Sequence, residues 1–270
     1  MSVRAMRRQL ARARQVLLTG TAPNSSALVR LRADPAAILT AAGLAADPWQ
    51  AECLRSQAPR TLLLCSRQAG KSTVAATLAL WDALFQERAL VLLLSPSQRQ
   101  SSELMRTVLW LHCASGALLP LRQQSGQQLQ LSNGSRIISL PGNEETVRGY
   151  AGVTLLVIDE AARVADALYY SVRPMLSVRQ GRLIALSTPF GKRGWFFHEW
   201  ESPEAWHRVT ISAPQCPRIR PSFLEEERRS LGERWFRQEY LCSFEEAVGA
   251  VFNAADIEAA MSDDVEPLDL

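Results

Sequence analysis

Lysine is almost absent from this sequence. Lys71 and Lys192 are the only lysines among its 30 basic residues, and the others are arginines. Where arginine supplies nearly every surface charge, a remaining lysine indicates a position that needs a compact ammonium group rather than a planar guanidinium. A phosphate-binding loop is such a position, so Lys71 is a candidate phosphate ligand.

Cysteine and histidine are also scarce, at five and three residues. The cysteines include no Cys-x-x-Cys pair and the histidines lack metal-ligand spacing, which argues against a zinc site and a disulfide framework. No apolar run reaches membrane-spanning length, and the basic N-terminus lacks the apolar segment of a secretory signal. We therefore expect a protein of a reducing compartment, the cytoplasm, with no membrane contact.

The stretch 61–73, TLLLCSRQAGKST, has the order of a nucleotide-binding P-loop. An apolar run suited to a buried strand breaks into a short polar loop and then a helix-like segment, so backbone N–H groups can turn onto phosphate oxygens. Lys71 would reach the outer phosphates of ATP and Ser72 would hold Mg²⁺. Cys65 replaces the first glycine of the GxxxxGK[ST] pattern, so a plain strand–turn–helix remains the alternative for this stretch alone. The predicted ATP-binding residues here are Ser66, Arg67, Gln68, Ala69, Gly70, Lys71, Ser72 and Thr73.

Trp49 and Gln50 lie a short distance ahead of this loop. They follow Asp47 and Pro48, a typical helix start. The aromatic face of Trp49 could stack on a nucleotide base and the Gln50 amide could read the edge of that base. The alternative for Trp49 is a plain packing role.

Two carboxylates end the apolar run 154–158. Asp159 and Glu160 would stand at the carboxyl end of a parallel strand, where open α/β sheets bind their ligands. Asp159 would hold Mg²⁺, and Glu160 would deprotonate the attacking water. A third apolar run, within 181–191, ends in Ser187 and Thr188, whose hydroxyls could sense the γ-phosphate and couple its loss to motion. An ordinary exit from a strand is the alternative for that pair.

Strand-like and helix-like stretches alternate through most of the chain, and Asn133-Gly134 indicates a hairpin within 129–138. We predict a three-layer α/β P-loop NTPase domain with a mainly parallel β-sheet and an antiparallel hairpin. The predicted boundaries are a basic N-terminal arm with a helix at 1–34, an ATPase domain at 35–245, and a linker with an acidic tail at 246–270.

Segments 47–50, 66–73, 157–162 and 186–191 together resemble the ATPase domain of the large terminase subunit of tailed bacteriophages. The likeness extends to 237–252, and that family's P-loop also commonly lacks the first glycine. The resemblance implies an ATP-hydrolysing motor that drives double-stranded DNA into a procapsid in the cytoplasm of the bacterial host. Its implied partners are the portal protein, the small terminase subunit and further copies of the chain in a ring.

The resemblance also implies roles for two arginines. Arg67 matches a P-loop arginine proposed to touch the γ-phosphate. Arg148 fits the position of an arginine that reaches into the neighbouring subunit, although spacing alone does not select it over Arg163 or Arg173. Such an arginine neutralises the charge that builds up on the departing phosphoryl group.

DNA contact is expected from Lys192 and Arg193, which follow the third apolar run, with the arginine-rich N-terminal helix as the alternative. Large terminases usually continue into a nuclease domain, for which 253–270 is too short, so we expect no DNA cleavage. Two other interpretations remain open. A helicase-like DNA translocase would need a second motor domain, and a non-catalytic nucleotide-gated assembly subunit would have no need of Glu160.

Overall fold

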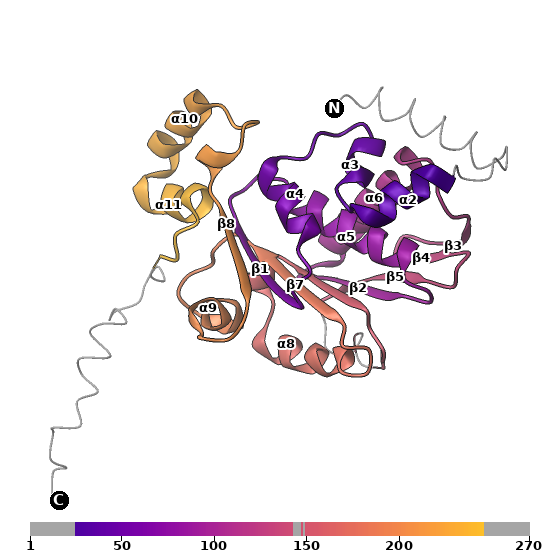
Figure 1. The fold of residues 1–270 in the computed structure, drawn as a ribbon. Coiled ribbons are helices and arrows are strands. Elements are labelled where there is room, and N and C mark those ends of the chain that lie inside the picture. The colour runs from indigo at the N-terminus through magenta and orange to yellow at the C-terminus, as the bar shows by residue number, and fades with distance from the viewer. Residues whose placement is uncertain (1–24, 143–146, 148, 246–270) are drawn as a thin grey trace, which may run out of the picture.

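The computed structural model describes residues 25–142, 147 and 149–245. Its centre is an eight-stranded sheet with the order β3-β4-β5-β2-β6-β7-β1-β8. The strands from β5 to β8 in this order run parallel, and β3 and β4 are antiparallel to their neighbours (Figure 1). The strand bounds are β1 Arg60–Cys65, β2 Leu90–Ser95, β3 Leu121–Gln124, β4 Gln128–Leu131, β5 Arg136–Pro141, β6 Leu155–Asp159, β7 Arg182–Ser187 and β8 His207–Ile211.

Helices cover both faces of this sheet, as Figure 1 shows. One face carries α2 Ser25–Ala33, α3 Ala37–Ala41, α4 Pro48–Arg55, α5 Lys71–Phe85 and α6 Gln98–Ala114. The other carries η1 Ala161–Arg163, α8 Asp166–Val172, η2 Arg173–Leu176 and α9 Gly194–Glu201. Beyond β8 follow η3 Ala213–Gln215, α10 Pro221–Leu231 and α11 Glu233–Leu241. The predicted three-layer α/β fold with its mainly parallel sheet is confirmed.

The apolar run of β1 shows why the central strands form. Leu63 and Cys65 belong to the core under α5, whereas Leu62 and Leu64 belong to the core under α9. Successive side chains of a strand point to opposite faces, so a strand covered on both sides needs an unbroken apolar sequence. The same arrangement holds for β2, which is buried along its whole length.

The predicted hairpin is also confirmed, because β4 and β5 pair antiparallel on either side of Asn133-Gly134. The described part of the predicted N-terminal arm forms α2, whose Leu31 carbonyl accepts a hydrogen bond from Trp81 Nε1 of α5 at 2.9 Å. The domain boundaries themselves stay a prediction. In the described part of the chain no helix is long and apolar enough to span a membrane.

Candidate nucleotide site

The loop between β1 and α5 has the backbone conformation of an anion-binding turn. Gln68 and Gly70 are both left-handed, with φ of 60° and 97°. The N–H groups of Gln68, Ala69 and Gly70 donate to no acceptor within the described ranges. Successive free amides in such a turn form a concavity that binds phosphate, and here they stand at the N-terminus of α5. The residues present therefore fit a nucleotide phosphate.

Elements from the C-terminal part hold this loop in place. The Ser66 N–H donates to the Ile211 carbonyl at 2.9 Å, and the Arg67 N–H donates to the Glu239 carbonyl at 3.1 Å. The Arg218 guanidinium donates to the Ala69 carbonyl at 2.8 Å. These contacts engage the first two amides and one carbonyl of the loop, and they leave the amides that follow available to a ligand.

Gln50 and Arg218 close over the same loop from two sides. Gln50 is 4 % exposed, and its Nε2 donates to the Gly70 carbonyl at 3.3 Å. Arg218 Nη1 also pairs with Asp47 Oδ1 at 2.7 Å, which joins the start of α4 to the P-loop. Trp49 is 8 % exposed and packs in the core beside α5, so its role as a base-stacking face stays a prediction.

Lys71 and the two acids meet at the carboxyl end of the sheet. Lys71 Nζ lies 3.1 Å from Glu160 Oε1, and both side chains are mostly buried. Glu160 has the strained left-handed backbone angles φ 50° and ψ 44°, and its N–H donates to Asp159 Oδ1 at 3.0 Å. Strain of this kind is tolerated where surrounding structure fixes it and clusters at functional sites. Sequence motifs far apart in the chain thus converge here.

Asp159 carries a perturbed carboxyl group. Burial raises its pKa to about 6, the nearby Glu160 carboxylate adds to the effect, and Lys71 opposes it. Asp159, Glu160 and Ser72 line one cavity of about 290 Å³. A hydroxyl and a buried carboxylate are hard oxygen donors of the kind Mg²⁺ takes beside phosphates, so Ser72 and Asp159 fit that ion. The described ranges contain no group of three His, Cys, Asp or Glu side chains arranged for a metal.

The predicted coupling residues lie against the same site. The Ser187 hydroxyl at the end of β7 accepts a hydrogen bond from the Ala162 N–H at 3.2 Å. That amide follows Glu160 by two residues, so the end of β7 is tied to the loop that carries the acid pair. Thr188 lines a second cavity of about 250 Å³ together with Lys71 and Glu160.

Arg163 and Glu239 belong to the surroundings of this second cavity, and no sequence signal had selected them for it. Glu239 of α11 is 5 % exposed, and its Oε2 lies 2.5 Å from Arg67 Nε. Its Oε1 lies 3.9 Å from Arg163 Nη2. Arg67, Arg163, Gln68 and Gln100 line the cavity with the residues named above.

Comparison with known proteins now decides the family. The family model for the N-terminal part of terminase large subunits of the T4likevirus type matches residues 62–259. The chain therefore belongs to the terminase large subunit family. Over 199 residues it is 27 % identical to the terminase large subunit of Escherichia phage T5, covering 70 % of this chain and 44 % of the T5 protein. The terminase chain thus spans less than half the length of that curated relative.

Solved structures agree on the fold. The large terminase ATPase domain of Thermus phage P74-26 is 20 % identical with a TM-score of 0.67, over 77 % of this chain and 97 % of that one. The large terminase of the HK97 bacteriophage is 14 % identical with a TM-score of 0.62, over 74 % and 51 %. The large terminase of a thermophilic bacteriophage, in complex with ADP, has a TM-score of 0.59 at 13 % identity, over 71 % and 51 %. The predicted terminase ATPase domain is confirmed.

Three predicted residues of the terminase chain stand apart from this site. Lys192 and Arg193 are exposed on the loop after β7, with the Arg193 guanidinium 4.8 Å from the centroid of the Phe190 ring. Arg148 lies outside the described residues. Its role in a neighbouring subunit therefore stays a prediction.

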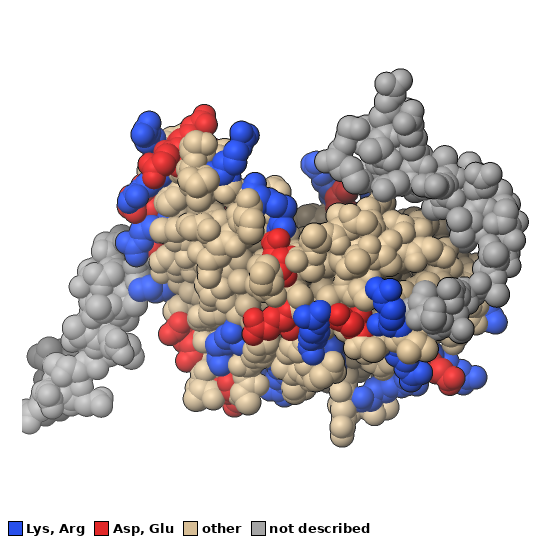
Figure 2. All heavy atoms as spheres, turned by 45° about the horizontal axis from the view of Figure 1, so that its top comes forward, with Lys and Arg blue, Asp and Glu red and all other residues tan. Residues whose placement is uncertain are grey.

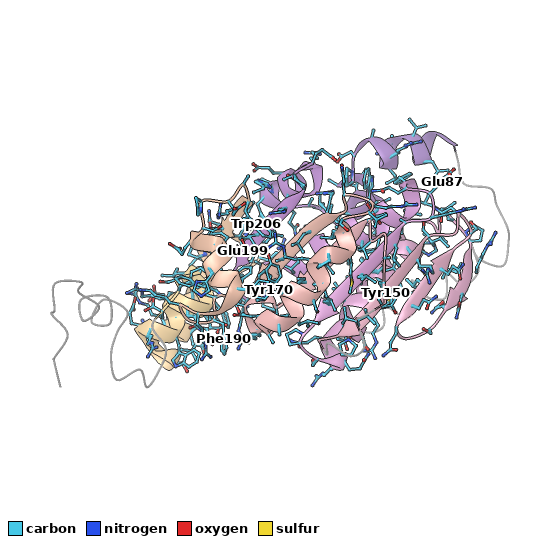
Figure 3. All side chains as sticks on the ribbon, turned by 90° about the horizontal axis from the view of Figure 1, so that it is seen from below. Glu87, Tyr150, Tyr170, Phe190, Glu199 and Trp206 are labelled. Atoms are coloured by element: carbon cyan, nitrogen blue, oxygen red, sulfur yellow. The ribbon has the colours of Figure 1, made fainter. Side chains whose placement is uncertain are left out.

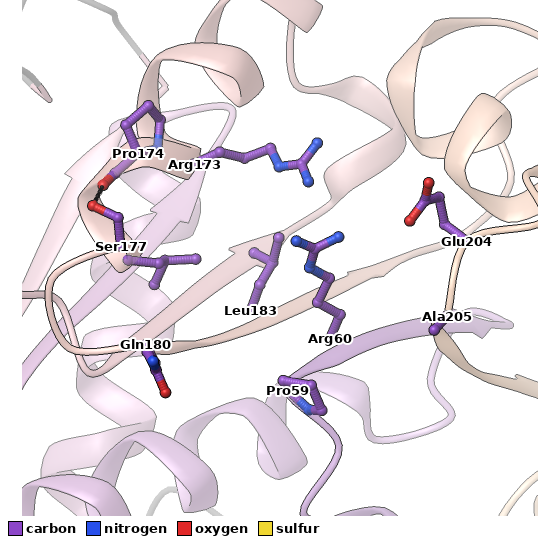
Figure 4. A pocket seen from close by; sticks show the side chains of 11 residues that line it. Pro59, Arg60, Arg173, Pro174, Ser177, Gln180, Leu183, Glu204 and Ala205 are labelled. Carbon is purple, nitrogen blue, oxygen red and sulfur yellow. Dashed lines mark hydrogen bonds between the residues drawn. The ribbon is translucent and has the colours of Figure 1, made fainter.

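The terminase chain has a larger cavity, of about 620 Å³, at the opposite ends of β1 and β7 (Figure 4). Arg60 and Arg173 point into it, and Arg173 also lies 3.5 Å from Glu199. Glu199 and Trp206 lie side by side (Figure 3), joined by a 2.8 Å hydrogen bond from Trp206 Nε1. Among the described residues that line this cavity, none belongs to the P-loop or to the acid pair, so it is separate from the nucleotide site.

Proposed function

We propose that this chain is the ATP-hydrolysing motor domain of a phage or prophage terminase, which drives double-stranded DNA into a procapsid. The observation that carries the proposal is the convergence of free P-loop amides, Lys71 and Glu160 around one cavity. The large terminase of the thermophilic bacteriophage, which shares the fold, has been solved with ADP and with ATP-gamma-S. We extend that nucleotide class to this chain.

The residues divide the work of phosphoryl transfer. Loop amides and Lys71 bind and orient the β- and γ-phosphates, and positive charge from Arg67 stabilises the departing phosphoryl group. Glu160 accepts the proton of the attacking water, which requires that Lys71 leaves Glu160 for the phosphates when ATP binds. Mg²⁺, when bound by Ser72 and Asp159, supplies electrostatic stabilisation of the phosphate charge.

Steady-state ATP hydrolysis against protein concentration tests the proposal, with Lys71→Ala as the blank. We expect turnover above the blank and, for Glu160→Gln, turnover lowered by about 100-fold or more with nucleotide still bound, because a positioned base contributes that much. A rate per molecule that climbs with concentration would support a ring in which Arg148 completes a neighbour's site. A parent rate equal to the blank would contradict the proposed hydrolase.

Double-stranded DNA, the portal protein and the small terminase subunit are the proposed partners, and the bacterial host cytoplasm is the proposed compartment. Membership of the terminase family supports all four. Ser187 and Thr188 are the proposed link from phosphate to motion, because the Ser187 hydroxyl accepts from the loop of the acid pair.

A further inference from the structure

Glu239 is an internal anion at the phosphate site. It comes from α11, far from the P-loop in sequence, yet it is 5 % exposed and binds Arg67 through both its side chain and its backbone carbonyl. Buried carboxylates are stable only when paired and hydrogen-bonded. Arg67 supplies that pairing in the absence of nucleotide.

Arg163 is the second cation directed at this carboxylate. Its guanidinium lies 3.9 Å from Glu239 Oε1 and 4.1 Å from the centroid of the Phe190 ring, so ring and carboxylate together fix its position. Cation–π contact with Phe190 holds the guanidinium without using its N–H donors. Those donors remain able to bind an anion in the 250 Å³ cavity that Arg163 lines.

The two arginines share one carboxylate, whereas Lys71 has Glu160 for itself. This part of the site therefore carries an uncompensated positive charge, which favours an anion of higher charge than a single carboxylate. A γ-phosphate bound by Lys71 and the loop amides would enter the same cavity, because Lys71, Arg67 and Arg163 all line it.

We propose that Arg67 and Arg163 of one chain form a clamp for the γ-phosphate, and that Glu239 is a positioning residue which occupies the clamp until that phosphate displaces it. This inference rests on the proposed function, and its new content is the role of Arg163 and Glu239. It has two consequences of opposite sign. Removing Arg163 weakens binding of a nucleotide with a γ-phosphate, and neutralising Glu239 strengthens it.

Calorimetric titration with ATPγS and with ADP, both with Mg²⁺, measures the γ-phosphate contribution without turnover. For Arg163→Ala we expect ATPγS to bind about ten-fold more weakly, the effect of one charge-assisted hydrogen bond, with ADP binding within about two-fold of the parent. Arg163→Lys should recover part of the loss because it keeps the charge. Arg122→Ala, an exposed arginine of the edge strand β3, is the matched control.

Glu239→Gln is the decisive variant, because it keeps the shape and a carbonyl acceptor but removes the competing charge. We expect ATPγS to bind about three-fold or more tightly and ADP to be unaffected, since an anion no longer competes for the arginines. General damage to the fold would instead weaken both nucleotides.

Three outcomes would overturn the clamp. They are equal loss of ADP and ATPγS binding in Arg163→Ala, no change for either nucleotide, or weaker ATPγS binding in Glu239→Gln. In each of these cases a parent that binds nucleotide while Lys71→Ala does not would leave the proposed function standing. A parent that binds neither nucleotide would overturn the clamp and the proposed function together.

Discussion

Two side chains from distant segments close directly on Gly70. A Cβ atom built on this glycine would lie 2.6 Å from Gln50 Nε2 and 3.1 Å from Arg218 Nη2. The left-handed φ of 97° adds a second reason for glycine, because side chains at this angle meet the backbone. The turn of the P-loop therefore depends on a missing side chain as much as on the groups present.

Gly70→Ala tests this dependence, and Gly116→Ala is its matched control. Gly116 has nearly the same φ, 99°, but no atom within 4 Å of the added Cβ. We expect Gly116→Ala to lower the free energy of unfolding by about 1 kcal/mol from the backbone alone. Gly70→Ala should cost more and should also weaken nucleotide binding, measured by thermal unfolding with and without ATPγS. Equal losses in the two variants would show that the contacts of Gln50 and Arg218 are unimportant.

The P-loop residues could be predicted because strand, loop and helix follow one another in the sequence. Arg163, Arg218 and Glu239 could not, because each is a single charged residue in a segment with many others, and only the fold brings them to the loop. Trp49 illustrates the opposite limit. Its position suggested contact with a base, whereas the structure buries it in the core.

Helix α5 is the element that joins the P-loop to the sheet, and it carries a buried acid near its end. Asp82 is 2 % exposed, accepts a hydrogen bond from Thr154 Oγ1 at 2.6 Å and another from Gln86 Nε2. Burial raises the pKa of Asp82 above its usual value, while the hydrogen bond from Thr154 opposes the shift. Burial in the helix–sheet contact therefore shifts the balance at Asp82 toward the protonated carboxyl.

Stability should consequently depend on pH through Asp82. A carboxyl whose pKa is raised in the folded state binds its proton more tightly there than in the unfolded chain. Its contribution is fully present below the unfolded pKa and is lost as pH rises through the folded pKa. Asp82→Asn removes this dependence, so the variant should gain stability relative to the parent as pH rises above about 4. Urea unfolding at several pH values measures the difference, and a constant difference would contradict the assignment.

The edge strands explain what sequence patterns missed among the elements. The central strands β1 and β2 are buried nearly throughout, so their apolar runs could be recognised. The strands β3 and β8 lie at the two edges of the sheet and are largely exposed or half-buried, so their sequences are mixed. A strand without a covered face needs no apolar pattern. The hairpin was predictable because its turn residues carry their own signal.

At the scale of the whole molecule, charge of one sign is not gathered on the face that Figure 2 shows. Basic and acidic side chains are interspersed over α10 and α11. The net charge is only +3. Any DNA contact must therefore come from local groups, of which Lys192 and Arg193 after β7 are the proposed pair.

Binding of double-stranded DNA should fall steeply with salt and ignore sequence, because phosphate contacts release counterions. We expect the double variant Lys192→Ala/Arg193→Ala to reduce the slope of log affinity against log salt by about one per lost contact. Fluorescence anisotropy over a salt series measures this, with Arg122→Ala as the control. A slope unchanged from the parent would remove this pair from the DNA surface.

The strand order also constrains when the nucleotide site can form. The strand that leads into the P-loop, β1, is hydrogen-bonded between β7 and β8, both from the second half of the chain. Its loop is fastened further by Ile211, Arg218 and Glu239. A ribosome delivers the chain from its N-terminus, at roughly 5–20 residues each second. The P-loop sequence therefore waits for well over a hundred further residues before its partners emerge, so nascent chains pass through a long interval in which the phosphate-binding loop exists without a frame.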